Sequence, residues 1–415
     1  MSKRTGNSLN PNSSKMSDLL TSEQVEDANN DGIVAKDELV NDKIVDSVSG
    51  ADGSYEEILG VEKEEKKAEQ PQEETRYNSR VLDPNEDEFE KGRDLTRNTP
   101  DDDVIVKMRD VRVSFKIGSL ERVIINHLNL DIKRGEILGL VGESGSGKTT
   151  IGRAIIRINK VSGGEILYNN VRISGKISKQ RERLLKTKIQ MIFQDPGDSL
   201  NDRANIDYIV SEGLRAFHLY EDEQDRINKV TEMMQRVGLR PEYLFRYPHE
   251  FSGGQRQRIG IARCMIMNPE FIVADEPISA LDVSIRAQVL NLIKEFKQER
   301  NMTVLFIAHD LSVVKYISDR IAVIYAGKIV ELAPALRLFE APLHPYTKSL
   351  LTAVPIPDPK IERKKKIITY NPGIHHYVLS DAPMLREIEP GHFVRCNTPE
   401  FEAYQAELKR LGGEK

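Results

Sequence analysis

The sequence predicts an α/β fold with a parallel sheet, preceded by an acidic segment and followed by a C-terminal extension. Three observations predict this organisation. Apolar runs of strand length alternate with helix-compatible segments over residues 104–340. One of these runs, "ILGLV", leads into the glycine-rich "GESGSGKTT" at 142–150 and then into a helical pattern. The composition changes at both ends of this region, so we expect three parts, 1–103, 104–340 and 341–415.

The first 103 residues differ in charge from the rest of the chain. They hold 27 acidic and 13 basic residues, whereas the remainder of the 415-residue chain holds 38 acidic and 47 basic ones. Stretches such as "VEKEEKKAEQPQEETR" offer few side chains that could pack. Because burial there cannot offset the entropy of ordering the chain, we expect residues 1–103 to be mostly disordered.

One stretch of this acidic segment resembles the calcium-binding loop of an EF-hand. "DANNDGIVAKDE", from Asp27 to Glu38, fits D-x-[DN]-x-[DN]-G-x5-E at every fixed position. Asp27, Asn29, Asp31 and Glu38 would supply oxygen ligands to Ca²⁺, and Gly32 would permit the sharp turn. The alternative is a chance match, because the surroundings are rich in Asn and Asp and no proper second loop follows. Both interpretations stay open.

The cysteines and the distribution of apolar residues indicate where in the cell the chain is expected. Cys264 and Cys396 lie far apart, and neither has a Cys or His partner at metal-ligand spacing, which favours a reducing, intracellular compartment. The N-terminal stretch lacks the apolar region of a signal peptide, and nowhere do about 18 uncharged apolar residues run together. We therefore expect any membrane role to require a partner.

The stretch "GESGSGKTT" predicts a phosphate-binding loop, because it matches G-x-x-x-x-G-K-[ST] between an apolar strand and a helix. Its glycines would let backbone N–H groups surround the phosphates of a nucleotide, and the helix start adds partial positive charge. Lys148 would pair with phosphate oxygens, and Thr149 would offer its hydroxyl to Mg²⁺. The candidate nucleotide-binding residues here are Gly142, Glu143, Ser144, Gly145, Ser146, Gly147, Lys148, Thr149 and Thr150.

Two carboxylates follow another apolar run, in "FIVADE". Asp275 would hold Mg²⁺, and Glu276 would accept a proton from the attacking water. The alternative is that these two acidic residues end a strand and have no catalytic role. The guanine-binding pattern N-K-x-D is missing, because "NKVS" and "NKVT" both lack the Asp, so adenine is the expected base.

Two further polar residues stand at predicted strand ends. Gln194 in "MIFQDP" and His309 in "VLFIAHD" each follow an apolar run. Parallel strands in such sheets direct their last residues toward the ligand. Each residue alone would be an ordinary strand end, but together with the preceding motifs they indicate one site.

Residues from about 196 to 262 predict a helical subdomain. Ile227, Val230, Met234 and Val237 recur at helical spacing, and we expect them in its core rather than in a stripe reserved for a partner. The same region ends in "FSGGQ", where a hydroxyl, two glycines and an amide stand at a predicted helix start and could hold an anion.

In this order the motifs resemble those of the ATP-binding-cassette (ABC) ATPases. The phosphate loop, "FQDP", "FSGGQ", "FIVADE", "SALD" and "AHD" follow one another over residues 104 to about 335. "FQDPGDSLN", "DEPISALDVSIRAQVLNLI" and "PLHPYTKSLLTAVP" are similar to one ATPase subunit of the oligopeptide and dipeptide importers. The resemblance implies a phosphate-loop NTPase fold with a RecA-like α/β core, an antiparallel β subdomain, an α-helical subdomain and a C-terminal extension.

The resemblance also implies roles for single residues. In this family the signature "SGGQ" closes over ATP held by the phosphate loop of a neighbouring chain, so that one chain supplies two half-sites. Gln194 would sense Mg²⁺ and the transmembrane partner, and His309 would contact the γ-phosphate. Phe115 would stack on adenine, or else be a plain core residue of its strand. The signature residues, with the residue that would bridge the two sites, are Ser252, Gly253, Gly254, Gln255 and Asp282.

The implied activity is ATP hydrolysis that powers the import of oligopeptides or dipeptides at the cytoplasmic face of the plasma membrane. The implied partners are a second, distinct ABC ATPase subunit, two transmembrane permease subunits and an extracytoplasmic peptide-binding protein, with no nucleic acid. Many relatives in this group carry an iron–sulfur cluster in the C-terminal extension. No such cluster is expected here, because only Cys396 stands in that stretch and one thiolate cannot hold a cluster.

Two rival functions remain at this point. The basic runs "KISKQRERLLKTK" and "ERKKK" would suit a cassette protein that acts on nucleic acid or ribosomes. A calcium-sensing tail would suit a regulatory module in which the cassette serves as a scaffold. The single set of motifs argues against the first rival, and the intact catalytic residues argue against the second.

Overall fold

The computed structural model describes residues 103–279, 281–354 and 365–413, which fall within one compact unit of the chain. The acidic segment up to residue 102, with the calcium-loop pattern from Asp27 to Glu38, lies outside the described residues. The described strands form two sheets. None of the described helices is both long enough and apolar enough to cross a membrane.

The first sheet is antiparallel, with the strand order β2-β1-β4-β5. Apolar residues of its long strands are buried, among them Val106, Met108 and Leu130. Where the first two strands pair, Phe115 lies opposite Arg122. This sheet confirms the predicted antiparallel β subdomain. Its strands are β1 (Val104–Ile117), β2 (Leu120–Lys133), β4 (Gly163–Tyr168) and β5 (Val171–Arg172).

The second sheet has the strand order β11-β12-β10-β9-β3-β8-β7-β6. The strands from β9 to β6 in this order are parallel, whereas β10, β11 and β12 pair antiparallel. Neighbouring strands β3, β8 and β7 are buried along their whole length and are apolar except for Thr303 and Asp275, as is typical of strands covered on both faces. Their carboxyl ends therefore lie at one edge of the sheet. The strands are β3 (Ile137–Val141), β6 (Ile189–Ile192), β7 (Phe271–Asp275), β8 (Thr303–Ile307), β9 (Arg320–Tyr325), β10 (Lys328–Pro334), β11 (Met384–Glu389) and β12 (His392–Cys396).

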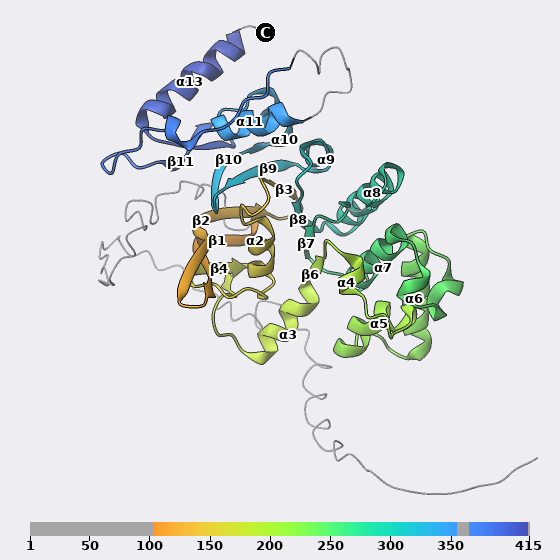
Figure 1. Cartoon of the computed structure of the whole chain (residues 1–415). Helices are drawn as coiled ribbons and strands as arrows, with labels where there is room; N and C mark the ends of the chain where they lie inside the picture. Colours follow the sequence, from red (N-terminus) through yellow and green to blue (C-terminus); the bar gives the residue numbers. More distant parts are fainter. Residues whose placement is uncertain (1–102, 280, 355–364, 414–415) are drawn as a thin grey trace, which may run out of the picture. The chain divides into compact units, whose positions relative to one another are not determined.

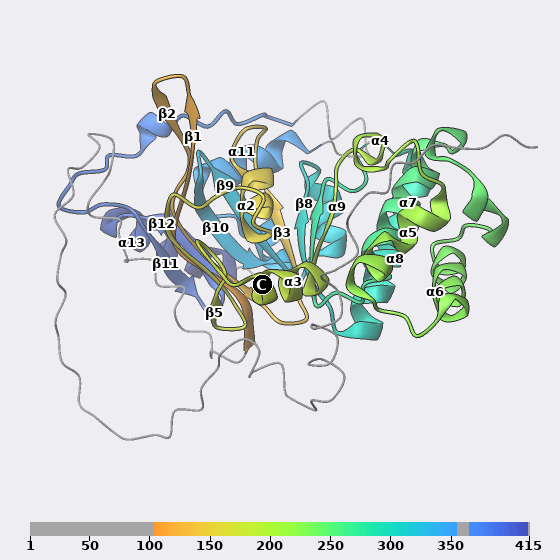
Figure 2. The same cartoon turned by 90° about the horizontal axis from the view of Figure 1, so that it is seen from below.

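The helices fall into groups around this sheet. Helix α2 begins directly after the glycine-rich loop and packs against β7 and β8. Helices α4, α5, α6 and α7 pack together beside β6, which confirms the predicted helical subdomain (Figures 1 and 2). The helices are α2 (Lys148–Ile155), α3 (Lys179–Lys188), α4 (Pro196–Ser199), α5 (Ile206–Phe217), α6 (Glu223–Arg236), α7 (Gly253–Met265), α8 (Val283–Arg300), α9 (Leu311–Ile317), α10 (Ala335–Glu340), α11 (Pro345–Ala353) and α13 (Thr398–Gly413), with 3₁₀ turns at Pro241–Phe245, Pro248–Glu250 and Pro372–Ile374.

The buried face of α6 differs in one residue from the prediction. Val230, Met234 and Val237 are buried, but Ile227 is 37% exposed, so the prediction that Ile227 belongs to the core is wrong. The neighbouring residue Arg226 is buried instead, where its guanidinium forms an ion pair with Asp207 at 2.8 Å. Arg226 is thus buried where helical spacing predicted Ile227, and its charge is tolerated there because it is paired with Asp207.

The C-terminal elements extend the second sheet and carry a small core of their own. Hairpin β11–β12 pairs with β10, and α13 packs against β11 (Figure 1). Leu343, Val394, Cys396 and Tyr404 are among the buried residues of this small core. These C-terminal elements are therefore joined to the central sheet by strand pairing.

Candidate functional site

The glycine-rich loop connects β3 to the first turn of α2. Gly147 begins the helix with a φ of 108°, a conformation that disfavours any side chain, and a Cβ there would overlap Ile125. Inside the loop, Lys148 Nζ donates hydrogen bonds to the carbonyl oxygens of Gly142 and Glu143, each at 2.8 Å. The ammonium group thus lies inside the loop, where the phosphates of a nucleotide would be cradled.

The charges around Lys148 are partly buried. Burial lowers the pKa of Lys148, and the carboxylates of Glu276, Asp275 and Glu143 act in the opposite direction. Burial raises the pKa of Asp275, although the Thr149 hydroxyl, 3.0 Å from its Oδ1, stabilises the carboxylate. An anionic phosphate beside the ammonium and a cation beside the carboxylate would both be favoured here.

Glu276 lies at the end of β7 with two polar side chains directed at one of its oxygens. Gln194 Nε2 donates to Glu276 Oε2 at 3.1 Å, and His309 Nδ1 lies 3.2 Å from the same oxygen. Glu276 has a φ of 45°, and its backbone N–H donates to the Ile307 carbonyl at 2.9 Å. A left-handed conformation is unfavourable for a residue with a side chain, and such strain is typical of functional sites.

One cavity of about 610 Å³ brings most of the predicted residues together. The sequence did not predict Arg122 and Ile124, which line this cavity because β2 pairs with β1 beside Phe115. Phe115 is 40% exposed, so it is not a core residue of its strand and its ring is available to a ligand. The lining residues are Phe115, Arg122, Ile124, Ser144, Gly145, Gly147, Lys148, Thr149, Thr150, Gln194, Glu276 and His309.

The signature residues do not line this cavity. Ser252 is exposed and begins α7, where its hydroxyl accepts the Gln255 N–H at 3.3 Å and its own N–H donates to Gln255 Oε1 at 3.0 Å. Gly253 is exposed beside it, and Gly254 lies so close to Ile285 of α8 that a Cβ would be 3.0 Å from that side chain. Ser252 and Gly253 thus form a helix start that is open to solvent, separate from the helix start at the phosphate loop.

The residue expected to bridge the two sites lies next to the signature. Asp282 begins α8, and its carboxylate accepts the N–H of Ile285 at 3.0 Å. Because Gly254 packs close to the same Ile285, the starts of α7 and α8 are neighbours. The structure therefore separates the predicted residues that line the nucleotide cavity from a signature surface. Gly142, Glu143, Ser146 and Asp275 are next to cavity residues in the chain but do not line the cavity themselves.

Comparison with known proteins assigns the fold to a family. A model of the ABC transporter family matches residues 125–279, and a model of the oligopeptide/dipeptide transporter C-terminal region matches residues 330–378. The oligopeptide transport ATP-binding protein OppF of Streptococcus pyogenes serotype M1 is 59% identical over 304 residues, which cover 73% of this chain and 99% of that protein. The chain belongs to the ABC transporter family.

Other relatives of this ABC ATPase agree with that assignment. The dipeptide transport ATP-binding protein DppF of Lactococcus lactis subsp. cremoris is 50% identical over 305 residues, which cover 72% of this chain and 96% of that protein. A solved dimeric ATP-binding cassette, bound to ADP and Pi after hydrolysis, is similar with a TM-score of 0.52 and 27% identity, over 56% of this chain and 99% of the other. The predicted phosphate-loop fold of the ABC ATPases is confirmed.

Proposed function

We propose that this ABC ATPase hydrolyses ATP to power the import of oligopeptides or dipeptides. The observation that carries the proposal is the convergence of Lys148, Thr149 and Glu276 on one cavity, with the buried Asp275 carboxylate 3.0 Å from the Thr149 hydroxyl. The peptide class is supported by the names of the two relatives described above, which are 59% and 50% identical. The C-terminal match at residues 330–378 supports the same branch of the family.

The residues of the cavity fit a nucleotide with Mg²⁺. The Thr149 hydroxyl and the Asp275 carboxylate, 3.0 Å apart, are oxygen donors of the kind that Mg²⁺ prefers when phosphates complete its coordination. Gln194 would add its amide oxygen, because its Nε2 is already engaged by Glu276. Mg²⁺ held there would neutralise charge on the β- and γ-phosphates. The exposed ring of Phe115, which also lines the cavity, would stack on adenine.

Hydrolysis would then follow from the positions of the chain's own groups. Glu276 Oε2 would accept a proton from the attacking water as its oxygen bonds to the γ-phosphorus. The bond from that phosphorus to the β,γ-bridging oxygen would break, and Lys148 would stabilise the negative charge on the phosphate oxygens. His309, 3.2 Å from Glu276 Oε2, would contact the γ-phosphate.

The separate signature surface supports a second ATPase subunit as a partner. Ser252, Gly253, Gly254 and Gln255 lie outside the nucleotide cavity, and the first two are exposed. In the proposed assembly they close over ATP held by the phosphate loop of the partner, and Asp282 bridges the two sites. A related but distinct ATPase subunit is the proposed partner, so the pair would be a heterodimer.

A further cavity supports contact with the membrane-embedded part of the transporter. It measures about 750 Å³ and is lined by residues of β6, α5 and α7. Gln194 lines both this cavity and the nucleotide cavity, so a partner seated there could influence Glu276 through Gln194. We place the chain at the cytoplasmic face of the plasma membrane as a peripheral subunit, with two permease subunits and an extracytoplasmic peptide-binding protein as further partners.

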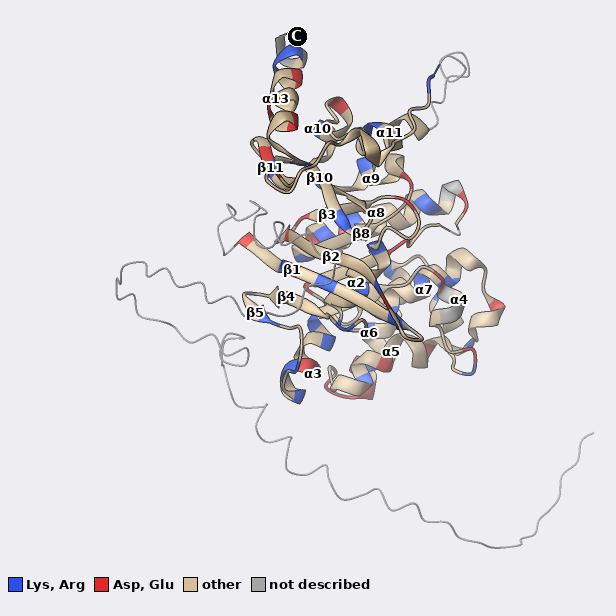
Figure 3. Ribbon diagram, turned by 60° about the vertical axis from the view of Figure 1, so that its left-hand side comes forward, with Lys and Arg blue, Asp and Glu red and all other residues tan. Residues whose placement is uncertain are grey.

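The basic run "KISKQRERLLKTK" does not favour the nucleic-acid alternative. Part of it forms α3, where Lys186 pairs with Glu182 at 3.0 Å, and Lys188 pairs with Glu270 at 2.9 Å. Figure 3 shows acidic residues beside basic ones on α3 and on α13. Such paired charges are typical of a solvated face rather than of a phosphate-binding surface.

Two measurements test the proposed function. The chain, purified from detergent extracts of its source membranes, should carry a second ABC ATPase and two permeases, identified by mass spectrometry. Cells that lack the chain should lose uptake of labelled oligopeptides or dipeptides, and the wild-type gene should restore it whereas Lys148→Ala should not. Companions that are ribosomal proteins, or unchanged peptide uptake in the deleted cells, would contradict the proposal.

The calcium-loop pattern stays a separate prediction, because it lies outside the described residues. If Asp27, Asn29, Asp31 and Glu38 bind Ca²⁺, titration of the full chain should release or absorb heat, and Glu38→Gln should abolish that signal. Equal heats for both chains would leave the pattern as a chance match.

A further inference from the structure

The phosphate loop is held from outside by a residue of the C-terminal part. The backbone N–H of Glu143 donates a hydrogen bond to the hydroxyl of Tyr346 at 2.9 Å, across 203 positions of sequence. The carbonyl of the same peptide unit, that of Gly142, accepts from Lys148 Nζ at 2.8 Å. One peptide unit of the loop is therefore held on one side by the phosphate-binding lysine and on the other by Tyr346.

The part of the loop that Tyr346 holds has little packing of its own. Glu143, Ser144 and Gly145 are exposed. At the far end of the loop, the Ser146 carbonyl accepts the N–H of Gly327 at 3.0 Å, from the turn between β9 and β10. The exposed half between these anchors therefore depends on its polar contacts to keep its N–H groups in place.

Tyr346 is itself held rigidly. It is 1% exposed, and its ring packs against Tyr325 and Tyr370 with centroid distances of 4.5 and 5.4 Å. It is the second residue of α11, and its backbone N–H donates to Nδ1 of His344 at 3.1 Å. Because the ring cannot move, its hydroxyl holds the Glu143 N–H of the loop at a defined position.

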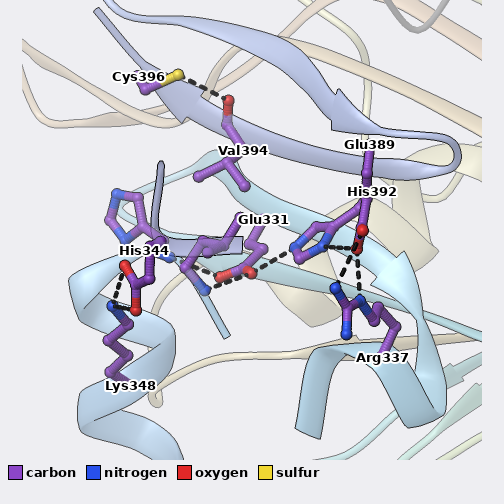
Figure 4. A network of polar contacts seen from close by, with 10 residues as sticks. Glu331, Arg337, His344, Lys348, Glu389, His392, Val394 and Cys396 are labelled. Atoms are coloured by element: carbon purple, nitrogen blue, oxygen red, sulfur yellow. Dashed lines mark hydrogen bonds and ion pairs between the residues drawn. The ribbon is translucent and has the colours of Figure 1, made fainter. Parts of the chain in front are cut away.

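The start of α11 is tied in turn to the C-terminal strands through Glu331 (Figure 4). Glu331 on β10 is 0% exposed, and its two oxygens accept the backbone N–H groups of Leu343 and His344 at 2.9 and 3.0 Å. His392 Nε2 lies 2.8 Å from Glu331 Oε1, and its Nδ1 lies 3.2 Å from Glu389. A continuous set of buried polar contacts therefore connects hairpin β11–β12 to the helix start that carries Tyr346.

We propose that Tyr346 is a positioning residue for nucleotide binding, through which the C-terminal part keeps the phosphate loop in its anion-binding conformation. The inference rests on the proposed function, in that the loop is taken to bind ATP. Tyr346 does not line the nucleotide cavity, so it acts through the Gly142–Glu143 peptide and not on the ligand. Loss of one buried hydrogen bond to that peptide would let the loop sample conformations that do not bind phosphate.

The test is Tyr346→Phe in the full chain, because this change removes the hydroxyl and keeps the packed ring. The dissociation constant for ATP should rise about three- to tenfold. In the assembled transporter the KM for ATP should rise by a similar factor while kcat stays within about twofold, as for a loss of uniform binding. The melting temperature of the nucleotide-free chain should stay near that of the wild type, because the ring contacts are kept.

Tyr370→Phe is the matched control. Its ring packs against Tyr346, yet among the described residues its hydroxyl makes no hydrogen bond to the loop, so ATP affinity should be unchanged. Wild-type affinity in Tyr346→Phe, or an equal loss in Tyr370→Phe, would overturn the inference.

Hydrogen exchange separates this inference from the proposed function. In Tyr346→Phe without nucleotide, a peptide spanning residues 140–148 should exchange faster than in the wild type, because the Glu143 N–H loses its acceptor. Unchanged exchange would overturn the inference even if the affinity fell. A wild-type chain that binds no ATP would refute the proposed function, while faster exchange in the variant would still support the Tyr346 contact.

Discussion

Among single residues, Glu276 combines a strained backbone with a carboxylate held by two neighbours. Its φ of 45° is left-handed, and Gln194 and His309 both contact its Oε2. These contacts direct the carboxylate toward the cavity beside the phosphate loop. Such an unfavourable conformation is typical of functional sites and agrees with the proposed role of Glu276, the acceptance of a proton from water.

Glu276→Gln should retain ATP binding and lose turnover, because an amide of the same shape cannot accept the proton. We expect kcat to fall by about a hundredfold or more, and the closed assembly to accumulate in the presence of ATP. Steady-state hydrolysis and ATP titration of the assembled complex would measure both effects. Turnover at the wild-type rate would remove Glu276 from the mechanism.

His344 is a second residue whose state has consequences, this time for stability. Its Nδ1 accepts the N–H of Tyr346, which requires the neutral ring. Burial, together with electrostatic effects of neighbours that include Arg395 and Lys348, lowers the pKa of His344 to about 3. The unfolded chain would protonate this histidine near pH 6.5. Its contribution to stability is therefore complete above that pH and is lost as the pH falls from there toward 3.

Between pH 7.5 and 5 the wild type should lose about 2 kcal/mol of unfolding free energy that a His344→Asn variant does not lose. Asn is a suitable replacement because its side-chain oxygen can accept the same N–H at the helix start. Urea unfolding of both chains at the two pH values would measure the difference. Parallel stability curves would show that His344 is not the group that titrates.

At the scale of elements, β10 is the strand to which the C-terminal part is fastened. Glu331 on this strand joins the backbone before α11 to His392 of β12. All of these groups are buried, so each donor depends on the carboxylate as its acceptor. These contacts of Glu331 resemble a buried ion pair. Removing one partner of such a pair is strongly destabilising, because the other partner stays buried without compensation.

Glu331→Gln should lower the unfolding free energy by about 3 to 5 kcal/mol. The new NH₂ group would replace an oxygen that accepts a hydrogen bond, so two buried donors would face each other without an acceptor. Glu387→Gln is the control, since Glu387 is exposed and the new amide oxygen can still accept the Gly391 N–H, so this change should cost less than about 1 kcal/mol. Thermal unfolding with far-UV circular dichroism would compare the two. Equal losses would show that Glu331 does not hold this joint.

The elements that could be predicted from sequence are those whose chemistry is local. The phosphate loop directly follows one buried strand, while Asp275 ends another and Glu276 follows it, so the pattern and the position coincide. Tyr346 lies 203 positions from its partner in the loop, and no local pattern signals such a contact. Arg122 lines the cavity because it pairs with Phe115 across two strands, and no motif in the sequence around Arg122 signals this position.

At the scale of the whole molecule, the chain presents a nucleotide cavity and a signature surface that do not meet within it. A γ-phosphate facing a helix start could receive two to four charge-assisted hydrogen bonds worth about 1.5 to 3 kcal/mol each. Association of two chains costs about 4 to 15 kcal/mol, and less when a shared partner tethers them. These magnitudes are comparable, so closure of the proposed pair would depend on the γ-phosphate and end with its hydrolysis.

Gly253 offers a test of this division, because a Cβ added there has no atom within 4 Å and the residue does not line the cavity. In the isolated chain, Gly253→Asp should bind ATP like the wild type and fold normally, since an acid in the first turn suits the helix dipole. In the assembled complex the new carboxylate would face the γ-phosphate held by the partner, and ATP hydrolysis should fall about tenfold or more. Gly253→Ala, which adds volume without charge, should have a smaller effect. Hydrolysis at the wild-type rate in the Gly253→Asp complex would mean that this surface does not close over a partner's nucleotide.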